Sequence, residues 1–303
     1  MEFPVTQIGF EQKFSTEEAC LMYFVQLKFK DGYKCSACGN DKYWLMSRRR
    51  IGCQKCKKRV SLTAGTLFEQ SNKPLLLWFR VIWLMVAQKN GISAIGVQRI
   101  MGFGSYRTAW AWLHKLRMIT VLSNRAKLNG KVEVDETFLG GKVSGKRGRG
   151  AEGKILVGIA VEILNKGTGR VRLSVIPNAS GNSLKSFVTN NIEFGSELIT
   201  DGWRHYRSIA GFKHTVILNE TSNEEENLLP HVHRIASLLK RWLLGTHQNY
   251  VTGNKMQNYL DEFTFRYNRR KSNSRGLLFQ RVLEQVVKHN PIPYAKVFES
   301  ADK

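Results

Sequence analysis

The sequence predicts an α/β protein whose C-terminal part holds a mixed five-stranded sheet with helices, preceded by two small modules. After residue 130, five short apolar or alternating segments are typical of strands with at least one buried face. Before residue 130, two Cys-X-X-Cys pairs are followed by helix-like apolar segments. We therefore expect three domains, at residues 1–68, 69–128 and 129–303.

The charge balance favours a polyanionic partner. The chain carries 47 Lys and Arg against 24 Asp and Glu, a net charge of +23. Residues 1–130 hold 21 basic and 7 acidic side chains (+14), and residues 131–303 hold 26 and 17 (+9). Such a field attracts nucleic acid, most strongly to the N-terminal part. A basic surface that serves only solubility is the alternative.

The sequence also indicates a cytoplasmic protein. Its first residues lack the basic start and apolar run of a secretory signal. The longest apolar stretch, residues 75–87, is interrupted by Arg80 and is shorter than the roughly 20 residues that span a bilayer. Pro74 suits the start of a buried core helix there. Disulfides are not expected in that compartment.

Four cysteines predict a structural zinc site in the first domain. Cys35 and Cys38 form one Cys-X-X-Cys pair, and after a spacer of 14 residues Cys53 and Cys56 form another. Each pair can present two thiolates to one ion, and four thiolates in a tetrahedron suit Zn²⁺. Disulfide pairing conflicts with the compartment. The fifth cysteine, Cys20, is expected to be a buried side chain without a metal.

Basic residues around the predicted ribbon favour contact with a DNA backbone. They lie on the excursion between the pairs and beside the second pair: Arg48, Arg49, Arg50, Lys57 and Lys58. A ribbon of this size builds little core, so we expect it to need metal to fold. A solvated ribbon that docks another protein is the alternative.

Residues 91–105 predict a short helix and a glycine turn, followed by a second helix that begins at Ser105. The second helix carries Arg107 and Lys115, and this outline is that of a DNA-binding helix-turn-helix. The specificity of the pattern is moderate, because short helices joined by glycine are common. We expect Trp110 and Trp112 to pack in a core rather than to contact bases.

From residue 131 the order of elements is β-β-β-α-β-α-β-α, which is that of an RNase H-like domain. The expected segments are strands at 132–138, 155–161 and 170–176, a helix at 180–190, a strand ending at Asp201, a short helical piece near Tyr206, a strand at 215–218 and a long helix from Pro230. The glycine-rich loop at 140–153 carries Lys146, Arg147 and Arg149, which we expect to hold DNA unless the loop is merely a solvated hairpin.

Asp135 and Asp201 are the candidate catalytic acids. Each lies in or directly after a short apolar strand, and in this fold the two lie side by side. Paired carboxylates can hold Mg²⁺ for phosphoryl transfer, although each could be an ordinary turn or cap residue. The helix from Pro230 offers His231 or His233 as a third ligand. Lys240, seven residues after His233, shares its helix face and could reach a phosphate.

Taken together, these motifs resemble insertion-sequence transposases of the DDE superfamily, in the ISXO-type group with an N-terminal zinc ribbon. The resemblance covers most of the chain through residues 35–56, 91–117, 134–142, 145–153, 200–202, 238–241 and 259–270. It implies an enzyme that binds transposon ends, cleaves DNA strands and joins them to target DNA. Asp135 and Asp201 would hold two Mg²⁺ or Mn²⁺ ions. The enzyme would act as a homodimer or larger assembly on double-stranded DNA, associated with a bacterial-type nucleoid.

One departure from the family pattern leaves alternatives open. Many relatives carry Glu seven positions before the Lys, where this chain has His233. His233 could ligate a divalent ion, a glutamate of 224–226 could take its place, or this copy could be inactive. A non-catalytic DNA-binding regulator would leave the two acids unexplained. A nuclease for RNA–DNA hybrids would leave the two N-terminal modules unexplained.

Overall fold

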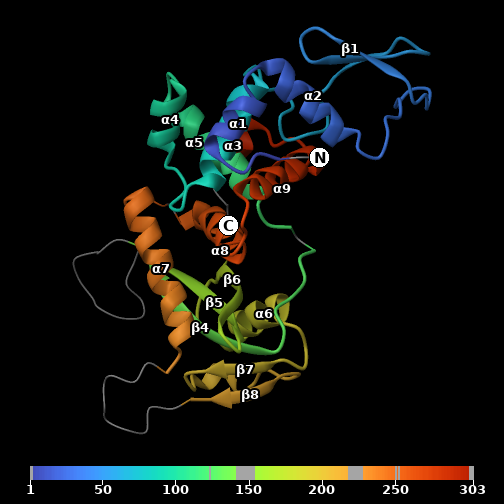
Figure 1. Cartoon of the computed structure of the whole chain (residues 1–303). Helices are drawn as coiled ribbons and strands as arrows, with labels where there is room; N and C mark the ends of the chain where they lie inside the picture. The colour runs from blue at the N-terminus through green and yellow to red at the C-terminus, as the bar shows by residue number, and fades with distance from the viewer. Residues whose placement is uncertain are drawn as a thin grey trace. The chain divides into compact units, whose positions relative to one another are not determined.

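The computed structural model describes residues 3–122, 124–140, 154–217, 228–249, 251 and 253–299. The chain divides into two compact units, Met1–Thr120 with Ser272–Glu299, and Val121–Lys271 with Ser300–Lys303 (Figure 1). Within the described residues, no helix combines the length and apolar character that a membrane crossing requires.

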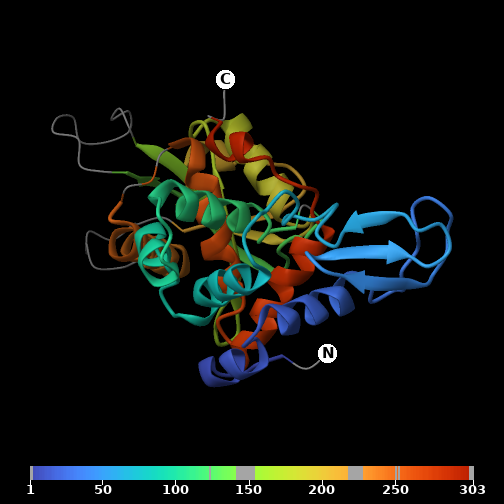
Figure 2. The same ribbon diagram turned by 90° about the horizontal axis from the view of Figure 1, so that it is seen from above.

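The first unit joins a helical core to a three-stranded sheet. Its helices are α1 (Gln7–Lys13), α2 (Glu17–Lys28), α3 (Leu75–Ala87), α4 (Ala94–Met101), α5 (Tyr106–Met118), α9 (Arg275–Lys288) and α10 (Tyr294–Phe298). Its strands are β1 (Tyr43–Met46), β2 (Arg50–Cys53) and β3 (Arg59–Ser61), which pair antiparallel in that order and are seen side by side in Figure 2.

Helix α3 is the centre of the helical core, as the apolar run at 75–87 predicts. The ring of Phe79 meets those of Phe14 and Phe279 at centroid distances of 5.1 and 5.5 Å, which ties α3 to the N-terminal helices and to α9. The helix has no capping side chain of its own. Glu17 supplies one instead, because its two carboxylate oxygens accept the N–H groups of Leu75 and Leu76 at 2.9 Å each.

The contact division differs from the predicted domain boundaries: it joins residues 1–68 to residues 69–120 and groups residues 121–128 with the sheet unit. Ser272–Glu299 group with the N-terminal unit, whereas the sequence places the whole of 129–303 in one domain. The physical reason is the apolar face of α9, whose Leu278, Phe279, Val282 and Val286 are buried. Burying this face stabilises the first unit, although α9 follows the second unit in the chain.

The second unit has the predicted mixed five-stranded sheet with helices. Its elements are β4 (Lys131–Leu139), β5 (Ile155–Leu164), β6 (Gly167–Val175), α6 (Gly181–Asn191), β7 (Glu197–Thr200), η1 (Arg204–Tyr206), β8 (Lys213–Val216), α7 (Pro230–His247), η2 (Gly253–Lys255) and α8 (Met256–Asn268). The strand order is β6-β5-β4-β7-β8, with β4, β7 and β8 parallel and β5 antiparallel to both its neighbours.

Helices cover both faces of this sheet, which explains why its strand β5 is a nearly continuous apolar run. One face packs on α7 and α8 through a cluster that includes Ile159 and Leu173. The other packs on α6 through a cluster that includes Val134 and Ala160. Gly158 permits a close approach on the α6 face, because a Cβ there would lie 3.0 Å from the ring of Phe187.

Candidate functional site

The two candidate acids lie level with each other, Asp135 on strand β4 and Asp201 directly after the parallel neighbour β7. The register pairs Val132 with Leu198 and Glu133 with Ile199. Continued for two residues, it aligns Asp135 on β4 with Asp201, which directly follows β7. Adjacent strands are about 4.8 Å apart, so both carboxylates lie where β7 ends beside β4. We call this place the Asp135 edge. Oδ1 of Asp201 accepts the N–H of Trp203 at 3.0 Å, which fixes the turn that follows.

A buried tyrosine hydroxyl lies close to this acidic edge. Tyr206, 1% exposed, donates a hydrogen bond from its hydroxyl to Oε2 of Glu136 at 2.9 Å. Burial raises the pKa of Tyr206 well above its ordinary value, and the charges of Glu136, Asp135 and Asp201 raise it further. Three carboxylates therefore act on the pKa of the same hydroxyl, which is consistent with a concentrated negative charge at this edge.

Helix α7 is fastened to β4 by Glu133, two residues before Asp135. Oε2 of Glu133 accepts the N–H groups of His231 and Val232 at 2.9 Å each, and its side chain is almost fully buried. The helix begins with Pro230 and has no local capping side chain, so this carboxylate supplies its N-cap. The anchored first turn brings Nε2 of His233 to 3.6 Å from Oδ2 of Asp135.

His233 and Lys240 lie on the exposed face of α7. The buried face consists of Val232, Ile235, Ala236, Leu239 and Leu243, at helical spacing. His233 and Lys240 are both exposed, and their separation of seven residues places them on one side. Lys240 therefore lies two turns of α7 beyond His233, about 10 Å along the helix axis.

The chemistry of these donors fits a divalent cation. Carboxylate oxygens and an imidazole nitrogen are ligands for Mn²⁺ or Mg²⁺, with Mg²⁺ favouring oxygen. Among the described residues, the one group of three or more ligand atoms already gathered is that of the four cysteines. Asp135 and His233 come together, while Asp201 does not join them in a single ligand shell.

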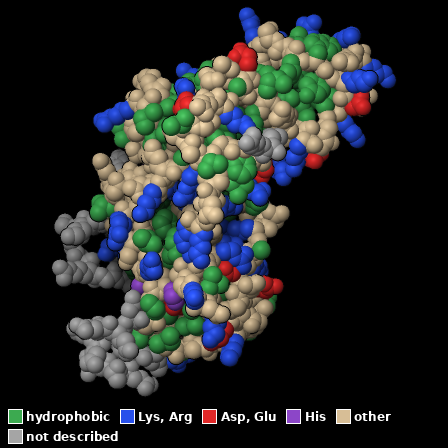
Figure 3. Space-filling model, in the orientation of Figure 1, with side chains coloured by type: hydrophobic (Ala, Val, Ile, Leu, Met, Phe, Trp, Pro, Cys, Tyr) green, Lys and Arg blue, Asp and Glu red, His purple; other side chains and the backbone are tan. Residues whose placement is uncertain are grey.

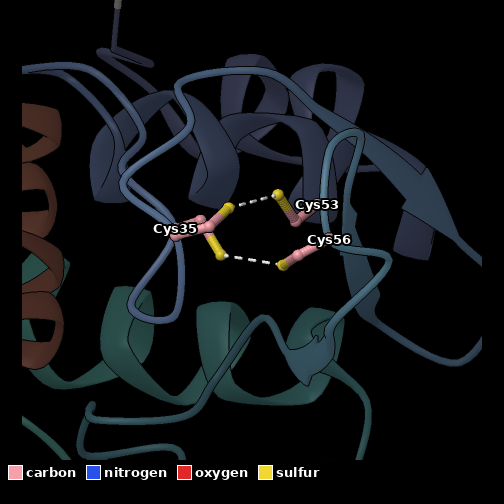
Figure 4. A group of neighbouring side chains, drawn as sticks. Cys35, Cys53 and Cys56 are labelled. Atoms are coloured by element: carbon pink, nitrogen blue, oxygen red, sulfur yellow. Dashed lines mark hydrogen bonds between the residues drawn. The ribbon is translucent and has the colours of Figure 1, made fainter.

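The four predicted zinc ligands converge at the base of the ribbon. Cys35, Cys38, Cys53 and Cys56 place their sulfurs within 4.8 Å of one another, and Figure 4 shows three of them facing inward. The Sγ atoms of Cys35 and Cys56 are 3.6 Å apart, as are those of Cys38 and Cys53. Four sulfurs about 2.3 Å from a central Zn²⁺ would be roughly 3.8 Å apart, so the geometry fits this ion.

Both Cys-X-X-Cys pairs form the same backbone turn. The N–H of Gly39 donates to the carbonyl of Cys35, and the N–H of Lys57 donates to that of Cys53. Gly39 and Lys57 have φ angles of 71° and 61°, in the left-handed region. Backbone N–H groups of Ala37 and Cys38 point at the Cys35 thiolate and lower its pKa to about 6. This lowering favours the thiolate form that metal binding requires.

The predicted DNA-contacting residues of the ribbon have different surroundings. Figure 3 shows Lys and Arg side chains spread over the face in view, with few Asp and Glu. Arg48 and Arg50 are exposed, and Lys57 lies 5.3 Å from the Trp44 ring centroid. Lys58 donates to Ser36 at 3.2 Å. The guanidinium of Arg49 donates to the carbonyls of Ser71 and Lys73, so this side chain also braces the ribbon.

Helices α4 and α5 occupy the predicted helix-turn-helix segment. Gly102, with φ 63°, ends α4, and Ser105 begins α5. Trp112 stacks on Trp78 with ring centroids 3.5 Å apart, as its expected packing role requires. Arg107 lies 4.3 Å from the Phe298 ring centroid, and burial lowers the pKa of Lys115. Both cations are therefore partly engaged within the protein.

Several sequence candidates lie outside the described residues. These are the basic loop residues Lys146, Arg147 and Arg149, and the glutamates at 224–226 that could replace His233.

Glu133, Glu136 and Tyr206 were not predicted as site residues. The period-two alternation of β4 places Glu133 on the same face as Asp135, which was an available signal. The hydrogen bond between Glu136 and Tyr206 joins residues 70 positions apart, so no local sequence pattern predicts it.

Two regions of the chain match known domain families. Residues 127–268 match the ISXO2-like transposase domain, and residues 15–59 match the transposase zinc-ribbon domain. A relative in Halobacterium salinarum is 23% identical over 279 residues, covering 84% of this chain and 91% of its own length. It is described as an uncharacterized protein in transposable element ISH50. The resemblance drawn from the sequence motifs is confirmed.

Proposed function

Because the chain joins a transposase zinc ribbon to an ISXO2-like transposase domain and is thus an insertion-sequence transposase, we propose that it cleaves and joins DNA strands at the Asp135 edge. The observation that carries the proposal is the alignment of Asp135 with Asp201, together with the approach of His233 to Asp135. The order of elements in the second unit supports an RNase H-like catalytic domain.

Asp135 and Asp201 are the proposed metal ligands, with His233 as the third. A divalent cation held there would stabilise negative charge at the phosphorus under attack. Glu133 would hold α7 so that His233 stays beside Asp135. Lys240, exposed on the same helix face, would bind a phosphate of the DNA and so orient the strand.

The zinc ribbon and the α4–α5 pair are the proposed DNA-positioning modules. Their exposed cations, such as Arg48 and Arg50, can contact the backbone without reading sequence. A helix-turn-helix role for α4 and α5 is supported by the glycine turn at Gly102 and the basic second helix. Joining two transposon ends would require at least two copies of the chain.

A strand-transfer assay on the cognate transposon ends, taken from the DNA that flanks the gene, tests this proposal. Unaltered protein is compared with Asp135→Asn, Asp201→Asn and His233→Ala in Mg²⁺ and in Mn²⁺. We expect joined products from unaltered protein, none from either aspartate variant, and undiminished end binding by both. End binding without cleavage in either metal would instead indicate a regulator or an inactive copy.

A further inference from the structure

The sheet unit contains a groove that the proposed chemistry does not use. It has a volume of about 550 Å³ and lies between Val121, Leu122, Arg125 and Lys127, the end of β6 and helix α6. Arg172 faces it from β6. The ladder pairs Arg172 with Ala160 and Ala160 with Val134, so Arg172 shares the α6 face of the sheet. Asp135, the next residue after Val134, points to the opposite face.

The lining has the composition of a phosphate-binding surface. Its cations are Arg125, Lys127 and Arg172, and no Asp or Glu is among its residues. The remaining polar groups are hydroxyls and amides, from Ser174, Asn182, Ser183, Ser186, Asn190 and Asn191. Arginine, lysine, serine and asparagine are among the side chains that commonly donate to DNA phosphates.

Helix α6 arranges part of this lining as a stripe. Asn182, Ser186 and Asn190 follow each other at intervals of four residues, and all three are exposed. The stripe is therefore about 12 Å long, at 1.5 Å per residue. Donors spread along a line suit a chain of phosphates, whereas a single phosphate ion needs donors that converge on one point.

The cationic wall of the groove is fixed in place. Arg172 is buried and donates to the carbonyls of Ala126 and Val171 at 2.6 and 3.0 Å. Arg170 is paired with Glu162 and donates to the carbonyl of Lys127 at 2.9 Å. The 126–127 backbone is thus tied to β6.

Positive charge in this wall is concentrated. Burial and the nearby charges of Arg125 and Arg170 lower the pKa of Arg172 to about 10. Asp261 on α8 interacts with Arg125 and offsets part of that charge. A bound anion would stabilise the remaining excess of positive charge.

We propose that this groove binds the sugar-phosphate backbone of duplex DNA, as a contact separate from the Asp135 edge. The proposal rests on the proposed function, since it extends the DNA path of the same enzyme. The α6 stripe would donate to successive phosphates, while Arg125 would supply charge. Because these contacts go to the backbone, the groove would position DNA without selecting its sequence.

Equilibrium binding of a labelled random-sequence duplex, without Mg²⁺ or Mn²⁺ so that no strand is cut, tests the groove. Two variants alter it, Ser186→Glu and Arg125→Gln. The matched control is Lys185→Gln, which changes the net charge equally on an exposed α6 residue outside the lining. Each groove variant should weaken binding by about three- to ten-fold, and Arg125→Gln should reduce the salt slope by about 0.9. Unchanged thermal unfolding midpoints would show that the variants fold.

The outcomes separate the groove from the proposed chemistry. If the groove variants bind duplex DNA as tightly as unaltered protein, the groove proposal is wrong, and the proposal of strand transfer at the Asp135 edge is unaffected. Weakened binding, with no cleavage by unaltered protein in either metal, would support the groove and contradict the chemistry. A third outcome would identify a free-phosphate site. Inorganic phosphate would raise the melting temperature of unaltered protein but not of Arg125→Gln, and the groove variants would bind DNA as tightly as unaltered protein. Unaltered protein that binds no duplex would overturn the groove proposal, and the strand-transfer assay would then test the chemistry by itself.

Discussion

Nε2 of His233 lies 3.6 Å from Oδ2 of Asp135, between the first turn of α7 and strand β4. This is longer than a hydrogen bond. Two neighbouring ligands of an octahedral cation, each about 2.1 Å from it, lie about 3.0 Å apart, so a shift of about 0.6 Å would let both atoms bind one ion. The imidazole therefore occupies a place where a third metal ligand would be expected, although it brings no negative charge.

Replacing His233 should change which metal supports catalysis. Mg²⁺ prefers oxygen, so the imidazole should make strand cleavage faster in Mn²⁺ than in Mg²⁺. His233→Glu should shift the Mn²⁺-to-Mg²⁺ rate ratio toward Mg²⁺ by about ten-fold, and His233→Ala should slow cleavage in both metals. Cleavage rates in each metal measure this ratio. His231→Ala is the control. If replacing His231 changes the ratio and replacing His233 does not, His231 is the third metal ligand instead.

Loss of the Glu133 carboxylate should destabilise the second unit. Glu133→Ala leaves two N–H groups of α7 without their acceptor in a buried setting, which should cost about 2–4 kcal/mol. Glu133→Gln keeps an acceptor oxygen and should recover part of the loss. Urea unfolding measures the difference. Glu197→Gln, a strand glutamate paired with Lys131, serves as the control and should change stability by less than about 1 kcal/mol.

Removing zinc should unfold the ribbon and spare the five-stranded sheet. Unaltered protein should carry one zinc per chain, and Cys53→Ser should lose it, because Cys53 is one of the four converging sulfurs. Metal analysis and limited proteolysis between residues 35 and 61 measure this. Cys20→Ala should keep its zinc, since burial raises the pKa of the Cys20 thiol to about 12 and disfavours the thiolate. Zinc loss from Cys20→Ala would contradict this assignment.

Asp261 should make the second unit less stable as the pH rises. Burial raises the pKa of Asp261 to about 6, above its ordinary value of 3.8, so the folded state binds the proton more tightly than the unfolded state. Stability from this group is fully present below about pH 4 and is lost as the pH rises through 6. Asp261→Asn should therefore stabilise the protein at pH 8 by up to about 3 kcal/mol and change little at pH 4.

Urea unfolding of Asp261→Asn at both pH values measures the effect. The substitution keeps an oxygen that can accept from Gln257, which donates to Asp261 at 2.9 Å. Asp41→Asn, at an exposed aspartate, is the matched control. Equal stabilisation by Asp261→Asn at both pH values would mean that titration is not the cause.

Local patterns in the sequence predict much of this architecture. The cysteine spacing predicts a metal cluster, and alternation with glycine breaks predicts the five strands, because both signals are short in range. The placement of α9 is different, since its buried face is equally compatible with either unit. Helix caps provided by residues far away in the sequence are also not predicted by local patterns. Glu17 is 58 residues from Leu75, and Glu133 is 98 residues from His231. Such partners are chosen by tertiary packing, which a local pattern does not encode.

The most direct test of the central claim is a Mn²⁺ titration followed by electron paramagnetic resonance. If Asp135 and Asp201 hold one cation site with His233, unaltered zinc-loaded protein should bind Mn²⁺. Asp135→Asn and Asp201→Asn should each abolish that binding, and His233→Ala should weaken it. Mn²⁺ affinity that is the same in both aspartate variants as in unaltered protein would contradict the account.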